Sequence, residues 1–342
     1  MDNAVTMSQL EQLIENSRAN EAIAQKLFDI ETAIIACQTS KELLQQLLSL
    51  IKDKFHLTHI HLLLAEPAPL NYLITNGAQS SWHRENTTKL PAQRLELLHP
   101  DHTPLLTNNM MKFSQLLPPS LLQSSSSAAF TPLMLEGKLF GSLIFVDDDK
   151  ERFNPSLGTY HLKQLGTKVS LCLSNVLIRE QLEYMANFDG LTGVGNRRLM
   201  EKNLLEELNR HQRYKVPFSV LFIDCNKFKQ LNDTYGHDCG DKVLHYIATE
   251  LKELIRDNDR CFRYAGDEFV VTLASQGITE AKFAAKRLIE HFERHHMNYE
   301  GYPLKMTISC GVATSDGQMS IEELLKAADE QLYLHKKGEI TY

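Results

Sequence analysis

The sequence lacks three features that would each indicate a particular class of protein. It has no Cys-x-x-Cys pair among its six cysteines and no excess of basic side chains, since its net charge is −7. It also has no uninterrupted apolar run of about 18 residues, which argues against a membrane span. The scattered cysteines argue against a disulfide framework or a zinc site and fit reduced thiols. The negative charge argues against general binding of nucleic acid.

The amino terminus and the length set the expected location and the number of domains. The first residues, MDNAVTMSQLEQ, contain neither a basic region nor an apolar core. We therefore expect no signal peptide and a cytoplasmic protein. A chain of 342 residues is long enough for two domains, each with its own core.

The stretch Cys261–Leu273, CFRYAGDEFVVTL, has the pattern of a β-hairpin that carries two acids. Aromatic and β-branched residues fill both halves, and Ala265-Gly266 between them suits a tight turn. Asp267 and Glu268 follow at once. Like charges this close repel each other unless a cation or a proton relieves them. The pattern fits either a solvated hairpin tip or a site for a cation.

A second stretch favours the site. Phe218–Asp224, FSVLFID, has the length of a buried strand and ends on an acid. Asp224 can meet Asp267 there and leave open positions for a hydrated Mg²⁺, which completes its shell with substrate phosphates. Asn232 and Asp241 follow, and an amide together with a carboxylate matches the hydrogen-bonding edge of guanine. The sequence therefore predicts a nucleotide site that contains a metal ion.

Several segments follow one another in a familiar order. DGLTGVGNRR, which begins at Asp189, precedes FIDCNKFKQLNDTYGHDCGD, then RYAGDEF, then TISCGVAT and ADEQLYLHKK. Together they resemble the GGDEF family of diguanylate cyclases, with RYAGDEF as an AGDEF form of the family signature. The first segment resembles the entry motif and the second resembles the metal and guanine segment. The resemblance extends from Asp189 to Lys337.

The resemblance implies an enzyme that joins two GTP molecules into cyclic di-GMP and releases two pyrophosphates. Each domain would hold one GTP, so the reaction would require a homodimer. Mg²⁺ or Mn²⁺ would lower the cost of forming the attacking alkoxide and shield the phosphate charge. The positions that match the family's metal and catalytic residues are Asp224, the carbonyl of Cys225, Asp267, Glu268, Arg263 and Lys336. Those that match its substrate-binding residues are Asn232, Asp241, Phe228, Lys229 and His237. For Glu268, the roles of metal ligand and of base both stay open.

Arg256 and Asp259 form an R-x-x-D pattern just ahead of the hairpin. By resemblance, this position is the family's inhibitory site, where the product binds. A guanidinium can donate to N7 and O6 of guanine, while a carboxylate accepts from its N–H edge. A lone R-x-x-D is usually a surface ion pair, but its position here favours product binding.

Three departures from the family pattern stand out. Ala265 replaces the first glycine of the signature, which the turn tolerates if the backbone angle there is ordinary. Asn226 stands where the family often has a second Asp, although Asp224 is retained. After Lys336 the expected Arg is absent, which puts the last phosphate contact in doubt.

The first part of the chain is predicted to contain a helix and a sensory domain. Residues 1–38 form a helix, because apolar residues recur at helical spacing, and it either pairs with its own copy or packs on the domain. Residues 39–160 resemble a GAF-like α/β domain that would receive an unknown small-molecule or protein signal. Histidines 56, 59 and 61 are more typical of half-buried strand residues than of metal or haem ligands.

The elements expected in this domain are a helix, a strand and a hairpin. The helix covers Ser40–Phe55 with Ser40 as its N-cap, and the strand covers His59–Leu64. Residues 65–127 show no clear pattern, and Ala128–Asp147 predicts two strands joined at Glu136-Gly137.

Residues 161–188 are predicted to form a connecting helix. Its apolar residues recur three and four apart, like an a/d seam, at Leu162, Leu165, Val169, Cys172, Val176, Leu182 and Met185. A parallel coiled-coil signalling helix and a helix that closes the first domain both fit this pattern.

Residues 189–342 are predicted to form an α+β domain. Strands separated by helices and one hairpin give a sheet with helices packed on it, similar to the ferredoxin-like palm of nucleotide polymerases. The last strand is expected around Leu304–Ala313.

A rival function is a catalytically silent module that binds GTP or cyclic di-GMP and acts through partners. A third is a cyclase that joins other purines. The intact set of acids and the amide favours the enzyme, and it consists of Asp224, Asp267, Glu268, Asn232 and Asp241. No E-A-L phosphodiesterase signature is present, so hydrolysis of the product is not expected.

Overall fold

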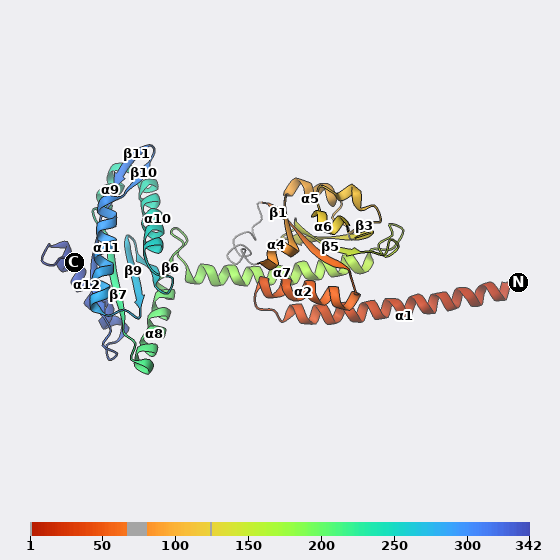
Figure 1. The fold of residues 1–342 in the computed structure, drawn as a ribbon, viewed down its shortest axis with the longest axis horizontal. Coiled ribbons are helices and arrows are strands. Elements are labelled where there is room, and N and C mark those ends of the chain that lie inside the picture. The colour runs from red at the N-terminus through yellow and green to blue at the C-terminus, as the bar shows by residue number, and fades with distance from the viewer. Residues whose placement is uncertain (1, 67–80, 124) are drawn as a thin grey trace. The chain divides into compact units, whose positions relative to one another are not determined.

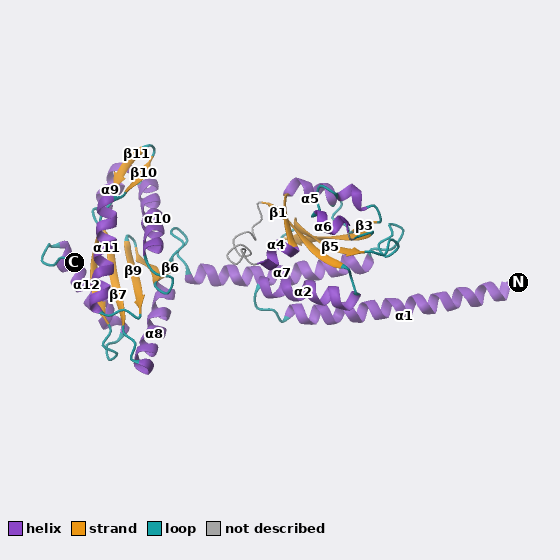
Figure 2. Ribbon diagram, viewed as in Figure 1, coloured by secondary structure: helices purple, strands orange, loops and turns teal. Residues whose placement is uncertain are grey.

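The computed structural model describes residues 2–66, 81–123 and 125–342. The chain divides into two compact units, Met1–Gln181 and Leu182–Tyr342, each with its own sheet (Figure 1). Both units combine helices with sheet, which confirms the predicted α+β class (Figure 2). Among the described helices, none combines the length and the apolar character that crossing a membrane requires.

Unit 1, Met1–Gln181, is built on a five-stranded sheet of order β2-β1-β5-β4-β3. The strands are β1 (His59–Glu66), β2 (Thr87–Pro91), β3 (Leu105–Thr107), β4 (Ser127–Leu135) and β5 (Lys138–Asp147). β4 and β5 form the predicted hairpin, with Leu135 opposite Lys138 next to the turn.

Helices cover both faces of this sheet. They are α1 (Asp2–Ile35), α2 (Ser40–Phe55), α4 (Ser81–Asn86), α5 (Ala92–Leu98), the 3-10 turn η1 (Met110–Phe113), α6 (Pro119–Gln123) and α7 (Tyr160–Asn187). One core joins α1, α2 and α7 to Ile60 and Leu62 of β1. A second core joins Leu63 to Leu95 of α5 and Met110. Because neighbouring strand residues point to opposite faces, these two cores lie on opposite sides of the sheet.

Two predictions for this unit are corrected by the structure. Thr39, not Ser40, caps α2, because its hydroxyl accepts a hydrogen bond from the backbone N–H of Glu42 at 3.2 Å. The stretch 65–127, expected to be irregular, contains short strands and helices in its described part. These elements are too short to show a period, and single buried residues such as Leu95 hold them. Residues 67–80 lie outside the described residues.

Most of the seam predicted for the connecting helix is internal to unit 1. Leu165, Val169 and Val176 are at most 5% exposed and pack in the core that α1 and α2 also form. α7 therefore closes the first domain, which is the second of the two alternatives. The division between the units falls within α7, after Gln181.

Unit 2, Leu182–Tyr342, contains a five-stranded sheet of order β12-β7-β9-β8-β6. Its strands are β6 (Gly195–Asn196), β7 (Phe218–Cys225), β8 (Arg260–Ala265), β9 (Glu268–Ala274) and β12 (Ile308–Thr314). The strand expected around Leu304–Ala313 is divided. β11 (Tyr302–Lys305) pairs with β10 (His296–Tyr299) in a separate hairpin, and β12 begins at Ile308.

Two pairs of helices cover the faces of this second sheet. These four helices are α8 (Arg197–Tyr214), α10 (His237–Leu254), α11 (Ile278–Arg294) and α12 (Ile321–Lys336), and a shorter helix, α9 (Phe228–Tyr235), adds Leu231 to the core of α10 and α11. α10 and α11 pack on the face that carries Leu221 and Ile223 of β7. α8 and α12 pack on the opposite face, which carries Val220 and Phe222. By the same alternation, Asp224 points to the face of α8 and α12 at the end of β7.

Candidate active site

The turn between β8 and β9 places the two adjacent acids of the predicted hairpin. Gly266 has a φ of +48°, the left-handed region that favours glycine. Ala265 does not share this conformation and pairs with Glu268 at the end of the hairpin. The turn therefore tolerates alanine at the first position of the signature, because only the second position requires glycine.

Acids from two separate segments meet next to this turn. Asp224, near the end of β7, lies directly opposite Glu268, the first residue of β9. The backbone N–H of Cys225 donates to the carbonyl of Asp267 at 3.3 Å, which ties the turn to β7. Lys336, the last residue of α12, brings its Nζ atom to 2.7 Å from Oδ1 of Asp224. The structure thus brings together four of the residues predicted for metal binding and catalysis, together with the backbone of Cys225.

Burial and mutual repulsion disfavour the charged forms of the carboxyl groups next to this turn. Burial raises the pKa of Asp267, and the negative charge of Asp224 raises it further. Burial also raises the pKa of Glu268, with additional repulsion from Asp224, Asp267 and Asp329. Partly buried acids that repel one another are stabilised by a cation, so the charge pattern favours the binding of a positive ion here.

The donor set fits a hydrated divalent ion. Carboxylate and carbonyl oxygens are the ligands that Mg²⁺ and Mn²⁺ prefer. Across the described ranges, no three His, Cys, Asp or Glu side chains are arranged as a ready metal cage. Mg²⁺ usually binds through one or two carboxylates and takes its other ligands from water and substrate phosphates. Asp224 and Asp267 with the carbonyl of Cys225 suit this kind of site.

The two predicted guanine ligands lie at adjoining helix ends. The Oδ1 atom of Asn232, in α9, is buried and has no hydrogen-bond partner. Its carboxamide packs against Gly240 in α10, where an added Cβ would lie only 2.0 Å from Oδ1. Asp241, the next residue, is exposed in the same turn of α10. A buried amide oxygen without a partner, next to an exposed carboxylate, can accept hydrogen bonds from a polar ligand at this position.

The other residues predicted to bind substrate lie at the amino-terminal ends of these helices. Phe228 begins α9 and is half-buried, with Cζ 3.2 Å from the position that a Cβ of residue 240 would take. Lys229 in α9 and His237 at the start of α10 are both exposed. Backbone N–H groups at helix amino termini are free to bind phosphate.

Arg263 forms its hydrogen bonds with groups of the protein itself. Its guanidinium donates to both carboxylate oxygens of Asp189 at 3.0 and 3.2 Å, and its Nε donates to the carbonyl of Gly266 at 2.9 Å. Burial acts to raise the pKa of Asp189, but hydrogen bonds from Thr192 and Arg263 outweigh it and leave that pKa below its usual value. The guanidinium of Arg263 is therefore paired within the protein, where it fixes the hairpin turn, and the catalytic role that the resemblance implies for it stays a prediction.

The R-x-x-D pair is also divided between two environments. Asp259 is 5% exposed and accepts hydrogen bonds from the backbone N–H of Ala274 at 3.0 Å and of Arg256 at 3.2 Å, as well as from Gln276 Nε2. Its carboxylate is therefore occupied by the protein, which does not support the predicted contact with the N–H edge of guanine. The side chain of Arg256 is exposed and lines a cavity of about 310 Å³.

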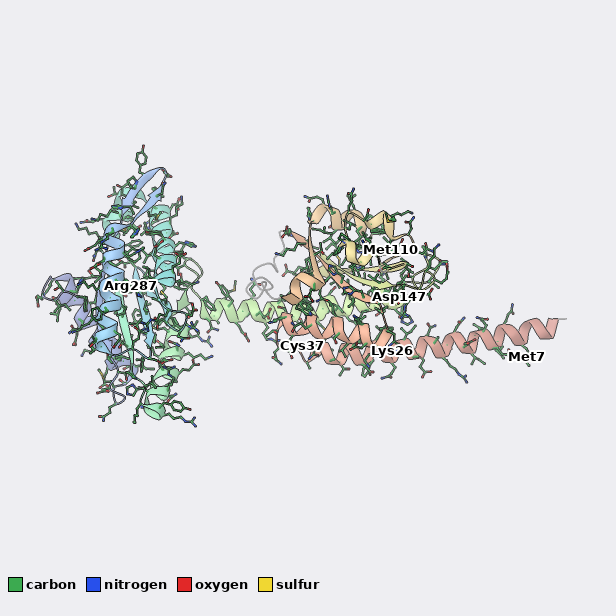
Figure 3. The ribbon with its side chains drawn as sticks, in the orientation of Figure 1. Met7, Lys26, Cys37, Met110, Asp147 and Arg287 are labelled. Carbon is green, nitrogen blue, oxygen red and sulfur yellow. The ribbon has the colours of Figure 1, made fainter. Side chains whose placement is uncertain are left out.

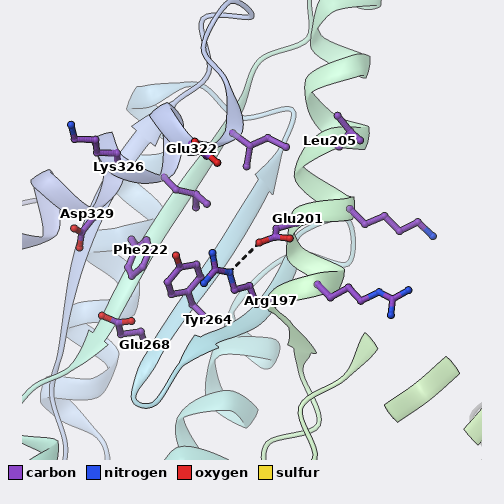
Figure 4. Close-up of a pocket in the computed structure, with 13 residues that line it drawn as sticks. Arg197, Glu201, Leu205, Phe222, Tyr264, Glu268, Glu322, Lys326 and Asp329 are labelled. Atoms are coloured by element: carbon purple, nitrogen blue, oxygen red, sulfur yellow. Dashed lines mark hydrogen bonds and ion pairs between the residues drawn. The ribbon is translucent and has the colours of Figure 1, made fainter. Parts of the chain in front are cut away.

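A groove next to the acids was not predicted from the sequence. It has a volume of about 910 Å³, lies between α8 and α12, and is lined by Glu268, Phe222 and Tyr264. Figure 4 shows Arg197 next to the ring of Tyr264, with its guanidinium carbon 4.8 Å from the ring centroid and its Nε hydrogen-bonded to Glu201. The residues that line the groove come from four separate segments of the sequence, so only the fold reveals that they share it.

Comparison with known proteins identifies both units. Residues 186–340 match the family model described as "Diguanylate cyclase, GGDEF domain". Residues 2–176 match the one described as "Protein of unknown function, DUF484". The GAF-like character expected for residues 39–160 stays a prediction, since the family matched there has no known function.

Individual relatives resemble about half of the chain. It is 33% identical over 187 residues to diguanylate cyclase DosC of Escherichia coli, an alignment that covers 54% of this chain and 41% of DosC. It is 34% identical over 164 residues to diguanylate cyclase DgcS of Shewanella oneidensis, covering 48% of this chain and 54% of DgcS. The chain thus spans about half, or less, of these relatives' own length.

A solved structure, in contrast, is covered almost completely. The coiled coil and GGDEF domain of DgcB from Caulobacter crescentus, in complex with c-di-GMP, is 22% identical to this chain with a TM-score of 0.48. The alignment covers 51% of this chain and 93% of that structure. The chain belongs to the GGDEF family of diguanylate cyclases through residues 186–340 and to the DUF484 family through residues 2–176.

Proposed function

We propose that this chain condenses two GTP molecules into cyclic di-GMP. In each of two equivalent steps, the 3′ oxygen of one GTP bonds to the α-phosphorus of the other, the bond from that phosphorus to the bridging oxygen breaks, and pyrophosphate leaves. The observation that carries this proposal is the meeting of Asp224 with the hairpin acids Asp267 and Glu268, next to Lys336.

The residues of the site have separate tasks in this reaction. Asp224, Asp267 and the carbonyl of Cys225 would hold Mg²⁺ or Mn²⁺, which when bound shields the phosphate charge and makes the 3′-hydroxyl easier to deprotonate. Glu268, whose pKa is raised by burial and by its acidic neighbours, is suited to accept that proton or to act as a further metal ligand. Lys336 supplies positive charge for the departing pyrophosphate.

Guanine recognition follows from the two helix ends. The Oδ1 atom of Asn232, which is buried and has no hydrogen-bond partner, would accept its missing hydrogen bond from the base. The carboxylate of Asp241 would accept from N1–H and N2–H₂, which adenine does not offer in this pattern. The pair therefore favours GTP over ATP.

Three further properties belong to the proposal. Each chain holds one GTP, so the working enzyme is a homodimer. The DUF484 region is a GAF-like sensory domain that responds to a small molecule or a protein, and cyclic di-GMP inhibits the enzyme at Arg256. The exposure of Arg256 at the edge of a cavity of about 310 Å³ supports a product site there, with Asp259 fixing the turn.

The test is to incubate the purified full chain with GTP and Mg²⁺ or Mn²⁺ and to measure cyclic di-GMP and pyrophosphate by chromatography. Asp224→Asn and Asp267→Asn should abolish the product, while Glu253→Gln, at an exposed acid of α10, should not. If the dimer binds GTP but makes no product, the chain is a silent binding module. A mixture of GTP and ATP tests whether other purines are joined.

A further inference from the structure

We propose that α1 and α7 of unit 1 together present one apolar face on which a second copy of this chain docks in parallel. The inference rests on the proposed function, which needs two copies, and specifies the surface that brings them together. This surface, called here the paired-helix face, consists of Met7, Leu10, Ile14, Phe28 and Ile35 on α1 and Leu171 and Ile178 on α7.

The side chains of the paired-helix face are large, apolar and open to solvent. Each is between 46% and 70% exposed. Figure 3 shows Met7 on the amino-terminal part of α1. Most of them are separated by seven residues, as Phe28 is from Ile35 and Leu171 is from Ile178. Seven residues make almost two full turns of helix, so each set forms a stripe along one side of its helix.

α1 and α7 run side by side in the same direction. Asn20 contacts His161 at 3.3 Å, Glu31 forms an ion pair with Lys168 at 2.6 Å, and the carbonyl of Cys37 accepts from Arg179 at 3.2 Å. The partners in these contacts are 137 to 142 positions apart, so the two helices stay in step along their shared length. They form a parallel pair.

The two stripes lie on the same side of this pair. At about 100° per residue, the α1 stripe is rotated by roughly 80° from Asn20 and Glu31, which face α7. The α7 stripe is rotated by roughly 80° from Lys168 and Arg179, which face α1, but in the opposite sense. For two parallel helices, opposite rotations of equal size bring both stripes to one side. Phe28 and Leu171 then lie nearly level and form an apolar layer.

The size of the paired-helix face matches what a dimer needs. Seven such side chains offer roughly 400 Å² of exposed apolar surface at about 100 Å² for each whole side chain. Apolar atoms make up about 60% of an interface, so the full contact is roughly 700 Å² per copy. Standard stable interfaces bury about 800 Å² per partner. A surface of this size and composition is suited to a second protein surface.

The amino-terminal arm of α1 favours a second copy as that surface. From Gln9 to Ala22 every side chain is exposed. A helical segment of this length is marginal in water without a partner. Met7, Leu10 and Ile14 stand at a, d and a positions, which pair with the same positions of an identical helix. Glu21 stands at a later a position of the same stripe, where it would face the Glu21 of the second copy, so this layer opposes the pairing and the apolar layers on either side of it have to supply the attraction.

A parallel arrangement of the two copies is favoured because α7 leads from unit 1 into the catalytic part of the chain. The stripe on α7 continues at the same spacing to Leu182 and Met185, which are 61% and 63% exposed. When two copies pair in parallel, the carboxyl-terminal ends of both α7 helices lie at the same end of the interface. The two catalytic chains then leave the interface together, as the joining of two GTP molecules requires.

The association is tested with Phe28→Glu and Ile178→Glu, and with Leu97→Glu as the matched control. Leu97 is 82% exposed on α5, outside the paired-helix face. Sedimentation velocity should show at least a hundredfold weaker dimer for both face variants and no change for the control, with circular dichroism melts confirming that all of them fold. Unchanged association of folded face variants would overturn the proposal.

The orientation is tested with Met7→Cys. In a parallel dimer the two introduced thiols lie at the same end, so mild oxidation should give a covalent dimer that the parent chain does not form. A dimer that cannot be cross-linked at this position would overturn the parallel arrangement. None of these measurements uses GTP, so a wild-type dimer that makes no cyclic di-GMP would refute the proposed function alone.

Discussion

The contact between Gly240 and Asn232 allows the guanine site to be tested without touching a residue that binds the base. In Gly240→Ala, the new Cβ would lie 2.0 Å from Oδ1 of Asn232 and 3.2 Å from Cζ of Phe228. The first distance is far below van der Waals contact, so the carboxamide has to turn away. The substitution therefore displaces the proposed ligand while leaving its chemistry intact.

The expected magnitudes have opposite signs for stability and for binding. Alanine is favoured over glycine within a helix by up to about 1 kcal/mol, so the free energy of unfolding should stay the same or rise. Loss of the hydrogen bond between Asn232 and guanine leaves a polar group unpaired, which costs about 1–3 kcal/mol. This corresponds to a roughly 5- to 150-fold increase in KM for GTP. A substitution that simply destabilises the domain would instead lower the free energy of unfolding and the affinity for GTP together.

The assay combines steady-state kinetics with urea unfolding. KM for GTP should rise in Gly240→Ala with a smaller change in kcat, and the midpoint of unfolding should not fall. Gly190→Ala is the matched control, because a Cβ at that position would have no neighbour within 4 Å. A folded Gly240→Ala variant with the wild-type KM would show that Asn232 does not contact the base.

Three further outcomes follow from the structure. Lys336→Ala should lower kcat by about a hundredfold, because a charge next to the phosphates is lost, whereas Lys337→Ala should have little effect on the rate of product formation. Burial lowers the pKa of His61 from 6.5 to about 4, so between these values the unfolded chain binds a proton that the folded chain does not. The free energy of unfolding should therefore fall by up to about 3 kcal/mol as the pH drops from 6.5 to 4, less so in His61→Gln, as measured by urea titrations. Asp259→Ala should cost about 3 kcal/mol of stability, because buried donors lose their acceptor, while Arg256→Ala should leave the melting temperature unchanged and weaken inhibition by added cyclic di-GMP.

The acids of the candidate site were predictable because the signals for them are local. The short apolar run Phe218–Asp224, which ends on an acid, and the glycine in the hairpin each depend on a few neighbouring residues. Two antiparallel neighbours in one sheet then have to bring the end of the first strand to the start of the second. Asp224 and Glu268 are opposite each other for this reason.

Arg263 shows what the local signals cannot supply. By resemblance, this cation next to two acids is a catalytic residue that supplies positive charge. The structure instead pairs it with Asp189, 74 positions earlier in the chain. The parallel pairing of β6 with β8 sets Asn196 opposite Arg263 and so brings the segment that begins at Asp189 to the hairpin. Sequence spacing contains no information about this pairing.

Asp259 shows that local sequence does not reveal whether a carboxylate is buried either. The R-x-x-D spacing is visible in the sequence, but an exposed and a buried carboxylate look alike there. The deciding partners are the backbone N–H of Ala274 and the amide of Gln276, at the far end of β9. Because these groups are buried, they need an acceptor, and Asp259 meets that need before any ligand arrives.

α7 shows that a correctly predicted helix can carry two apolar stripes that face different surroundings. Leu165, Val169 and Val176 face the core of unit 1, while Leu171 and Ile178 face solvent. Both sets recur at helical spacing, so periodicity alone cannot tell which stripe meets the chain's own domain. The position of Gly166 shows which stripe packs on the chain's own sheet. A Cβ at residue 166 would lie 2.6 Å from the Thr131 side chain, so α7 approaches the sheet on the side of Gly166. Leu171 and Ile178 lie about a third of a turn away from that side, which leaves them free for a second copy.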